Sequence, residues 1–197
     1  MTLADRTIEE FLESVASDAV TPSGGAAAGV GGAMGAALCE MVCIHTLGTD
    51  EHADVADEMT DLRETLAASR RRLLELADDD LTAVDRVQAA FESGDSDRIQ
   101  AAAKRSTTVP LETAETCLDV VDAAVTVTAK GTPVAVPDAV AGALFAQAAL
   151  EASVSTVHAN LGTIEDPEFV AEMERRSAET EAAAQEAISQ VRANRNW

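Results

Sequence analysis

The chain has 197 residues, of which 35 are acidic and 14 are basic, so its formal net charge is −21. Binding to a nucleic-acid backbone requires a basic patch that neutralises phosphates, so this composition excludes nucleic acid as an expected partner. Lys104 and Lys130 are the only lysines. High acidity with few lysines is typical of proteins from salt-loving microbes, in which salt screens the repulsion between like charges, and we expect such a source.

Length and cysteine usage predict a single domain, residues 1–197, whose core needs neither disulfides nor a metal. The three cysteines, Cys39, Cys43 and Cys117, are odd in number and lie in apolar helical patterns. The spacing of Cys39 and Cys43 is not that of a common zinc site, and the three histidines form no HExxH-like pair. We therefore expect no metal site.

The N-terminal region predicts a cytoplasmic protein without a membrane span. Glu9, Glu10 and Glu13 occupy the place where a secretory signal carries basic residues. The uncharged run 24–39 that follows is 16 residues long and ends at Glu40. A membrane span needs about 20 apolar residues, so this run is too short.

The segment 21–45, TPSGGAAAGVGGAMGAALCEMVCIH, predicts a helix rich in small residues. Pro22 suits a first helical turn, and Thr21 or Ser23 can cap it. Glycines recur at helical spacing in two series, Gly25, Gly29 and Gly32, and Gly31 and Gly35. Because each interior glycine costs about 1 kcal/mol relative to alanine, we expect a compensating interaction. Two such interactions are possible. In the first, another helix or a planar ligand approaches the bare backbone. In the second, the helix N-terminus presents its N–H donors to an anion.

Residues 52–91 predict a long amphipathic helix, because apolar side chains recur at steps of three and four. These side chains are Val55, Met59, Leu62, Leu66, Leu73 and Leu76. Four positions further, Asp80 continues the same stripe, whereas Asp78 and Asp79 rotate away from it. A carboxylate that faces a core is a candidate for a raised pKa and acid–base chemistry. The alternative is that the helix breaks at Ala77 and the three aspartates form a solvated turn.

Three further helices complete the predicted fold. The first runs from about Pro110 to Thr128, and the second runs from Pro137 to Leu161 with apolar residues nearly all round, so it should be central and buried. The last follows Asp166, a predicted cap. Asp138, near the start of the central helix, complements the helix dipole or takes part in the chemistry. We expect an all-α bundle of five to six helices, with long amphipathic helices around the central apolar one.

The order and spacing of several motifs resemble the cyclodeaminase/cyclohydrolase family of folate enzymes. This family includes the C-terminal domain of formiminotransferase-cyclodeaminase and stand-alone methenyltetrahydrofolate cyclohydrolases. The resemblance covers nearly the whole chain. It is carried by the helix IEEFLESVAS, the turn Pro22 to Gly25, the pair Met41 and Val42, Asp80 with Ala83, Pro110, Pro137 with Asp138, the segment 156–161 and Asp166.

The resemblance implies an all-helical homodimer that binds a tetrahydrofolate derivative, with no metal and no cofactor beyond this substrate. Asp80 is our first candidate for a base that then acts as an acid, and Asp138 is the second. We expect the remaining site residues to bind the substrate, with the cations and the free N–H groups facing its glutamate carboxylates. They are Ser23, Gly24, Gly25, Lys104, Lys130 and Asn160.

Three functions remain open. The first is hydrolysis of 5,10-methenyltetrahydrofolate to 10-formyltetrahydrofolate, which we expect because the sequence carries no attached transferase domain. The second is formimidoyltetrahydrofolate cyclodeaminase activity, which closes the same ring and releases ammonia. The third is a catalytically silent helical dimer or scaffold, because Ala26 and Thr156 stand where the family pattern has serine and asparagine.

Overall fold

The computed structural model describes residues 2–194, and its regular elements over this range are all helical. The α-helices are α1 (Ile8–Val15), α2 (Gly24–Leu47), α3 (Ala56–Ser93), α4 (Ser96–Lys130), α5 (Val136–Leu161) and α6 (Pro167–Ala193), with short 3-10 helices at Leu3–Asp5 and Asp50–Val55. The predicted all-α class is confirmed. The predicted start of the last helix is confirmed too, because the Asp166 side chain accepts hydrogen bonds from the N–H groups of Glu168 and Phe169.

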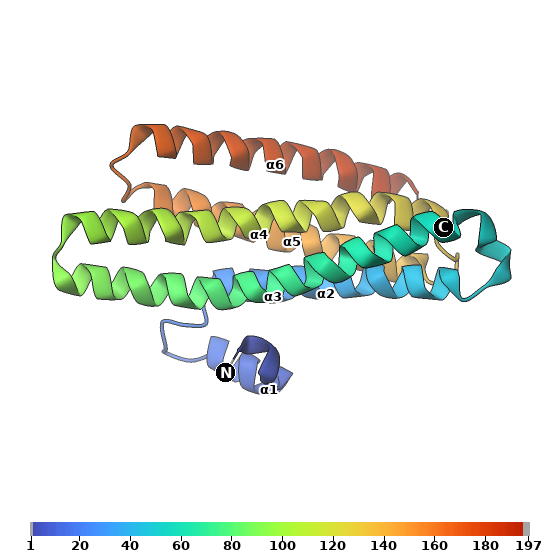
Figure 1. The fold of residues 1–197 in the computed structure, drawn as a ribbon, viewed down its shortest axis with the longest axis horizontal. Coiled ribbons are helices and arrows are strands. Elements are labelled where there is room, and N and C mark those ends of the chain that lie inside the picture. The colour runs from blue at the N-terminus through green and yellow to red at the C-terminus, as the bar shows by residue number, and fades with distance from the viewer. Residues whose placement is uncertain (1, 195–197) are drawn as a thin grey trace.

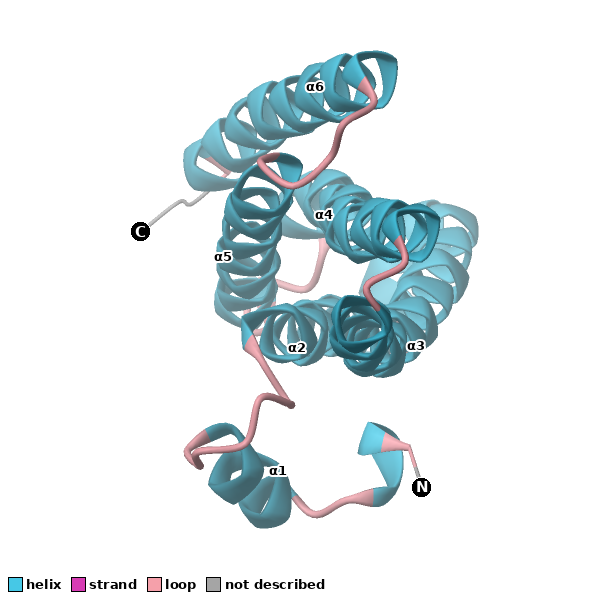
Figure 2. Ribbon diagram, turned by 90° about the vertical axis from the view of Figure 1, so that its left-hand side faces the viewer, coloured by secondary structure: helices cyan, strands magenta, loops and turns pink. Residues whose placement is uncertain are grey.

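Four long helices, α2 to α5, pack side by side as a bundle (Figures 1 and 2). α2 packs against α3 and α5, and α4 packs against the same two helices. α6 covers the outside of α4 and α5, while α1 lies apart from the bundle below α2 and α3 (Figure 2). α5 contacts α2, α4 and α6, and the apolar helix that the sequence predicted to be buried is buried on this inner side only, because Leu144 and Phe145 are 40 % and 46 % exposed. α5 is one wall of the bundle, and its apolar outer face has no cover in the single chain.

Glycines allow α2 to approach its neighbours closely. A Cβ atom built on Gly29 would lie 2.9 Å from the Leu73 carbonyl oxygen, and one built on Gly35 would lie 2.5 Å from the Gly142 carbonyl oxygen. Both distances are shorter than real Cβ contacts, so α3 and α5 contact the bare backbone of α2. Helix packing therefore accounts for these glycines. A Cβ on Gly31, by contrast, would meet no neighbouring atom within 4 Å.

Pro110 does not begin a helix, as the sequence predicted, but lies inside α4, which begins at Ser96. The Asp95 side chain caps this earlier start by accepting from the N–H groups of Asp97 and Arg98. A proline inside a helix leaves the carbonyl four residues earlier without its N–H donor, and this carbonyl belongs to Ser106. Asn160 of α5 donates its amide to the Ser106 oxygen at 2.8 Å. A tertiary contact thus supplies the hydrogen bond that Pro110 cannot make.

Two helices, α2 and α5, are long and apolar enough to cross a membrane by length and composition alone. In each, half of the most apolar window is buried inside the bundle. The helices pack against one another, and their outward faces expose Met34 and Ile44 on α2 as well as Leu144 and Phe145 on α5. Core helices of a bundle meet the same criterion of length and composition.

Candidate active site

Asp80 is the centre of the candidate site, and it points from α3 toward the N-terminus of α2. α3 is continuous from Ala56 to Ser93, so the alternative of a helix break at Ala77 is wrong. The predicted inward orientation of Asp80 is confirmed, because the residue is only 6 % exposed. Its carboxylate accepts a hydrogen bond from the Ser23 hydroxyl at 3.2 Å and another from the backbone N–H of Ala26.

Gly25 makes this contact between helices possible. A Cβ atom built on Gly25 would collide with the carboxylate of Asp80. The carboxylate thus lies directly on the bare first turn of α2, where N–H groups have no partner within the helix and the helix dipole favours negative charge. One of the two alternatives from the sequence was that this N-terminus presents donors to an anion, and in the structure the group that accepts from it is the Asp80 carboxylate. The carboxylate therefore also has a structural role that we did not predict, because it caps α2.

Burial raises the pKa of Asp80 above the ordinary value of 3.8. The hydrogen bonds from Ser23 and Ala26 act in the opposite direction and are outweighed by the loss of solvation. A carboxyl group whose pKa moves toward neutrality exchanges protons more readily near physiological pH. The site therefore holds a group suited to accepting a proton and returning it.

The two aspartates before Asp80 fix the surroundings of the site. Asp78 accepts the backbone N–H of Leu3 at 2.9 Å, which ties the N-terminal segment to α3. Asp79 forms an ion pair with Arg105 of α4, with 2.8 Å between the Arg105 nitrogen and the Asp79 oxygen. Each of the three consecutive carboxylates thus contacts a different element of the fold.

Ser23 and Gly24 lie at the start of α2, beside Asp80. Ser23 occupies the N-cap position, as predicted for Thr21 or Ser23, but its side chain forms no cap hydrogen bond and donates to Asp80 instead. Pro22 precedes the helix and is not part of its first turn, which corrects the sequence prediction. A Cβ on Gly24 would meet no neighbouring atom within 4 Å, so this residue borders open space.

Lys104 and Asn160 lie toward the same end of the bundle as Asp80, but both side chains already have partners. Lys104 forms an ion pair with Asp166 at 2.6 Å, and its ammonium group lies 5.3 Å from the centre of the Phe169 ring. Asn160 donates to the Ser106 carbonyl left free by Pro110. The structure thus gives both residues a role in holding α4 against its neighbours.

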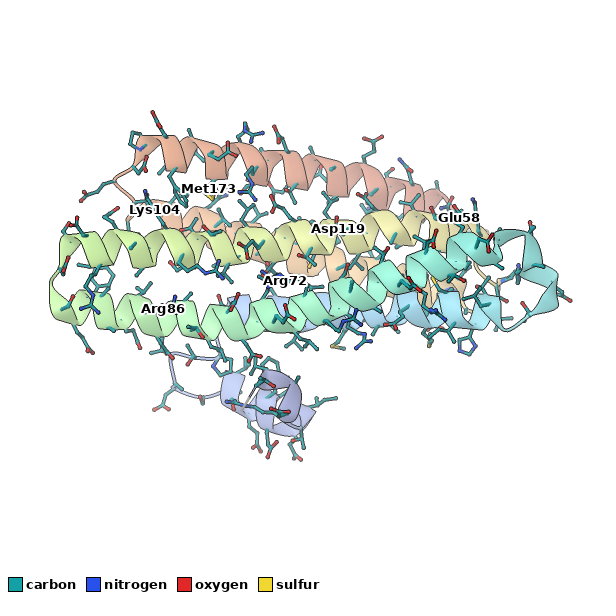
Figure 3. The ribbon with its side chains drawn as sticks, viewed as in Figure 1. Glu58, Arg72, Arg86, Lys104, Asp119 and Met173 are labelled. Atoms are coloured by element: carbon teal, nitrogen blue, oxygen red, sulfur yellow. The ribbon has the colours of Figure 1, made fainter. Side chains whose placement is uncertain are left out.

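Lys130 and Asp138 lie at the opposite end of the bundle from Asp80. Lys130 pairs with Glu58 at 2.6 Å, and Glu58 precedes Asp80 by 22 residues of α3, which is about 33 Å at 1.5 Å per residue. Figure 3 shows Glu58 at one end of the bundle and Lys104 toward the other. Asp138 is exposed in the first turn of α5 and next to Ala139, whose carbonyl accepts from the Cys39 thiol. Within one chain, neither residue joins the Asp80 site.

The three cysteines are buried within the bundle. Loss of solvation raises the pKa of Cys39 and of Cys117 to about 12, and that of Cys43 to about 11. These thiols are therefore protonated at neutral pH and poor metal ligands. Within residues 2–194, no three histidine, cysteine or acidic side chains gather in a geometry that could hold a metal ion.

Sequence analysis missed two parts of this region. The first is the N–H of Ala26, because a backbone donor has no signature in the side-chain pattern. The second is a groove between α3 and α4 that is lined by Arg86, Arg98 and Arg105. Residues 86–105 contain three arginines, but residues 63–72 contain four, so the number of arginines in a segment does not locate this groove.

Comparison with known proteins identifies the relatives of this chain. A family described as formiminotransferase-cyclodeaminase matches residues 7–179. A methenyltetrahydrofolate cyclohydrolase from Methylorubrum extorquens is 36 % identical over 177 residues, which cover 85 % of each protein. The crystal structure of formiminotetrahydrofolate cyclodeaminase from Thermotoga maritima matches with a TM-score of 0.94 and 28 % identity, over 97 % of this chain and 96 % of that one. The chain belongs to the formiminotransferase-cyclodeaminase family.

Proposed function

We propose that this enzyme hydrolyses 5,10-methenyltetrahydrofolate to 10-formyltetrahydrofolate. The observation that carries the proposal is the buried Asp80 carboxyl group, held by Ser23 and Ala26 over the bare backbone of Gly25. The Methylorubrum extorquens relative, a methenyltetrahydrofolate cyclohydrolase, supports the choice of reaction.

The reaction requires a base and then an acid, and one carboxyl group can serve as both. The carbon between N5 and N10 of the substrate is an amidinium-like cation. Water adds to this carbon, forming a C–O bond, while the Asp80 carboxylate takes one proton from the water. The C–N5 bond then breaks, and the protonated Asp80 returns its proton to N5. The formyl group remains on N10, and the second proton of the water leaves to solvent.

Ser23 and α2 act on the carboxyl group and not on the substrate carbon. The Ser23 hydroxyl donates to Asp80 Oδ2, so the orientation of the carboxyl group is fixed before substrate binds. The negative charge of Asp80 also stabilises the cationic carbon of the substrate. We propose that hydrolysis proceeds with no metal and no cofactor beyond the folate, because the substrate carbon is already cationic and the addition of water and the cleavage of the C–N5 bond need only proton transfers for assistance.

A second candidate is formimidoyltetrahydrofolate cyclodeaminase activity, in which N10 closes the ring and ammonia leaves. The Thermotoga maritima cyclodeaminase, which matches almost the whole chain, favours this candidate. The same carboxyl group would move the protons. A third candidate is a silent helical protein, which Ala26 and Thr156 favour, as these positions carry serine and asparagine in the family pattern.

The methenyl chromophore separates the three candidates. A cyclohydrolase makes the absorbance of added methenyltetrahydrofolate decay faster than it does without enzyme. A cyclodeaminase makes this absorbance rise when formimidoyltetrahydrofolate is added, with release of ammonia. A protein that changes neither rate in molar salt is silent, and this result would contradict the proposal.

We propose that the enzyme is a homodimer in which a second copy covers the α2–α5 face, the exposed outer side of α2 and α5 with Met34, Ile44, Leu144 and Phe145. We also propose that it is a cytoplasmic protein from a salt-loving source, without nucleic-acid or membrane partners. Met34 on α2 is 53 % exposed and Phe145 on α5 is 46 % exposed, and exposed apolar side chains on two neighbouring helices support an interface. Lys130 and Asp138 lie too far from Asp80 to contact it within one chain, so any role of theirs in the site would require a second copy.

Sedimentation velocity tests this interface. Phe145→Glu should shift the protein to monomer, whereas Phe91→Glu, which alters an exposed phenylalanine on α3, should not. A wild-type protein that is monomeric at micromolar concentration would contradict the homodimer. A wild-type protein that requires detergent for solubility would instead indicate that the α2–α5 face contacts a membrane.

A further inference from the structure

Asp80 is almost closed off from solvent, which limits how it can exchange a proton with a reactant. Only 6 % of the residue is exposed. One turn away on α3, the apolar residues Leu76, Ala77 and Ala83 are buried beside it. On the α2 side, its carboxyl group lies over the bare backbone of Gly25. A reactant outside the bundle therefore has little direct access to the carboxyl oxygens.

Ser23 is the only side chain within residues 2–194 that forms a hydrogen bond with Asp80. Its hydroxyl donates to Asp80 Oδ2 at 3.2 Å, and the other donor is the backbone N–H of Ala26. The neighbouring carboxylates of Asp78 and Asp79 have partners of their own. A hydroxyl can donate one proton while it accepts another, whereas an amide N–H is a donor only. Ser23 is therefore the one hydrogen-bonding partner of Asp80 in this part of the chain that can pass on a proton.

The Ser23 hydroxyl is also close to open space and free to accept a hydrogen bond. Ser23 is half-buried, and the next residue, Gly24, is exposed with no atom within 4 Å of a Cβ built on it. An N-cap serine ordinarily accepts from an N–H of the first helical turn, but the Ser23 side chain forms no such bond. The N–H of Ala26 is instead taken by Asp80. The acceptor lone pairs of Ser23 thus remain available to a water molecule.

We propose that Ser23 relays protons between the buried Asp80 carboxyl group and the folate reaction. The relay deepens the proposed function and rests on it, with Asp80 still the base and then the acid. As water adds to the methenyl carbon, one water proton moves to Ser23 Oγ and the Ser23 hydroxyl proton moves to Asp80 Oδ2. As the C–N5 bond breaks, Asp80 returns its proton to Ser23 Oγ and the Ser23 hydroxyl proton moves to N5. Ser23 begins and ends each step as a neutral hydroxyl.

Substitutions of Ser23 test the relay through the decay of methenyl absorbance. Ser23→Ala removes the hydroxyl but no cap hydrogen bond, so kcat should fall at least about tenfold while KM stays within about threefold. Ser23→Thr restores a hydroxyl and should recover most of the lost kcat. Ser23→Asn supplies a donor that can orient Asp80 and a preferred N-cap residue, but an amide cannot relay a proton, so kcat should stay low. Ser96→Ala, which removes an exposed hydroxyl from the first turn of α4, is the matched control.

The other possible roles of Ser23 give different results. If Ser23 only orients the carboxyl group, Ser23→Asn keeps the kcat of the wild type. If Ser23 only binds substrate, Ser23→Ala raises KM and leaves kcat unchanged. Either result would overturn the relay. Rates in mixtures of H2O and D2O should follow a curve against the deuterium fraction, because two protons move together, and a straight line for the wild type would overturn the relay too.

Carbon-13 NMR titration of the aspartate carboxyl groups tests the contact without turnover, with the Asp80 signal identified by its absence in Asp80→Asn. Donation by Ser23 lowers the pKa of Asp80, so Ser23→Ala should raise the Asp80 titration midpoint and Ser96→Ala should not. An unchanged midpoint in Ser23→Ala would overturn the proposal. Folate turnover that is insensitive to Ser23→Ala would refute the relay and leave the proposed function intact. A raised midpoint in a protein whose wild type turns over no folate would refute the proposed function and leave only the hydrogen-bonded pair.

Discussion

Replacement of Asp80 by asparagine removes the proton-accepting group while keeping its shape. The asparagine Oδ1 can still accept the N–H of Ala26, so the cap of α2 is retained. General acid–base catalysis contributes factors of 10² to 10⁴, so we expect kcat to fall about a hundredfold, which is a loss of about 2.7 kcal/mol in transition-state stabilisation. The assay is the decay of methenyl absorbance in molar salt. Asp85→Asn, the same change at an exposed position of α3, is the control.

The pH dependence of stability tests the raised pKa of Asp80, on which this catalytic role depends. Burial raises the pKa of Asp80 in the folded state above 3.8, so the folded state favours the protonated form. The stabilising contribution of this group is therefore complete below about pH 3.8 and is lost as the pH rises through the folded pKa. Asp80→Asn has no such titration, so its Tm relative to wild type should rise between pH 4 and pH 7.

The reasoning on Asp80 has clear refuting results. A kcat within threefold of wild type would remove Asp80 from the mechanism. If the Tm of Asp80→Asn instead falls relative to wild type as the pH rises, the hydrogen bonds and the helix dipole lower the pKa of Asp80 more than burial raises it. A lower Tm together with lower activity at every pH would indicate that the main role of Asp80 is to cap α2.

Three further predictions follow from the packing and the charge. Gly25→Ala should displace the Asp80 carboxylate and lower kcat at least about tenfold. Gly162→Ala, at a glycine that faces open space, should leave kcat unchanged. Equal kcat values for the two variants would contradict the close contact between Gly25 and Asp80. Asn160→Ala should lower the free energy of unfolding, measured in urea, by about 1 kcal/mol. In the Pro110→Ala background, where α4 regains its N–H donor, the same substitution should lower this free energy much less. Additive effects of the two substitutions would refute the link between Asn160 and Pro110. The Tm should rise between 0.1 M and 1 M salt, because the screening length falls from about 10 Å to about 3 Å. A neutral osmolyte should raise the Tm less, because it does not screen charges. A Tm that does not change with salt would mean that the acidic groups do not repel one another appreciably.

The glycine helix illustrates what a sequence pattern leaves open. Small residues at helical spacing indicated a close approach, and Gly29 and Gly35 do contact the backbones of α3 and α5. The same pattern was compatible with a ligand on those glycines, because it specifies an absent side chain and not the group that fills its place. Only the packing shows that protein backbone occupies the space.

Local periodicity by itself determined the helical class and placed Asp80 on the apolar stripe of α3, because these properties depend on the 3.6-residue repeat along one element. It left open whether that helix ended at Ala77. The cap at Asp166 was equally local. The partners of these groups depend on which helix ends meet, and this depends on how all the helices cross. Tertiary structure alone therefore decided that Asp80 caps α2 and that Asn160 allows Pro110 inside α4. It also decided that Lys130 and Asp138 lie at the far end of the bundle, since residues distant in sequence are brought together or separated only when the core packs.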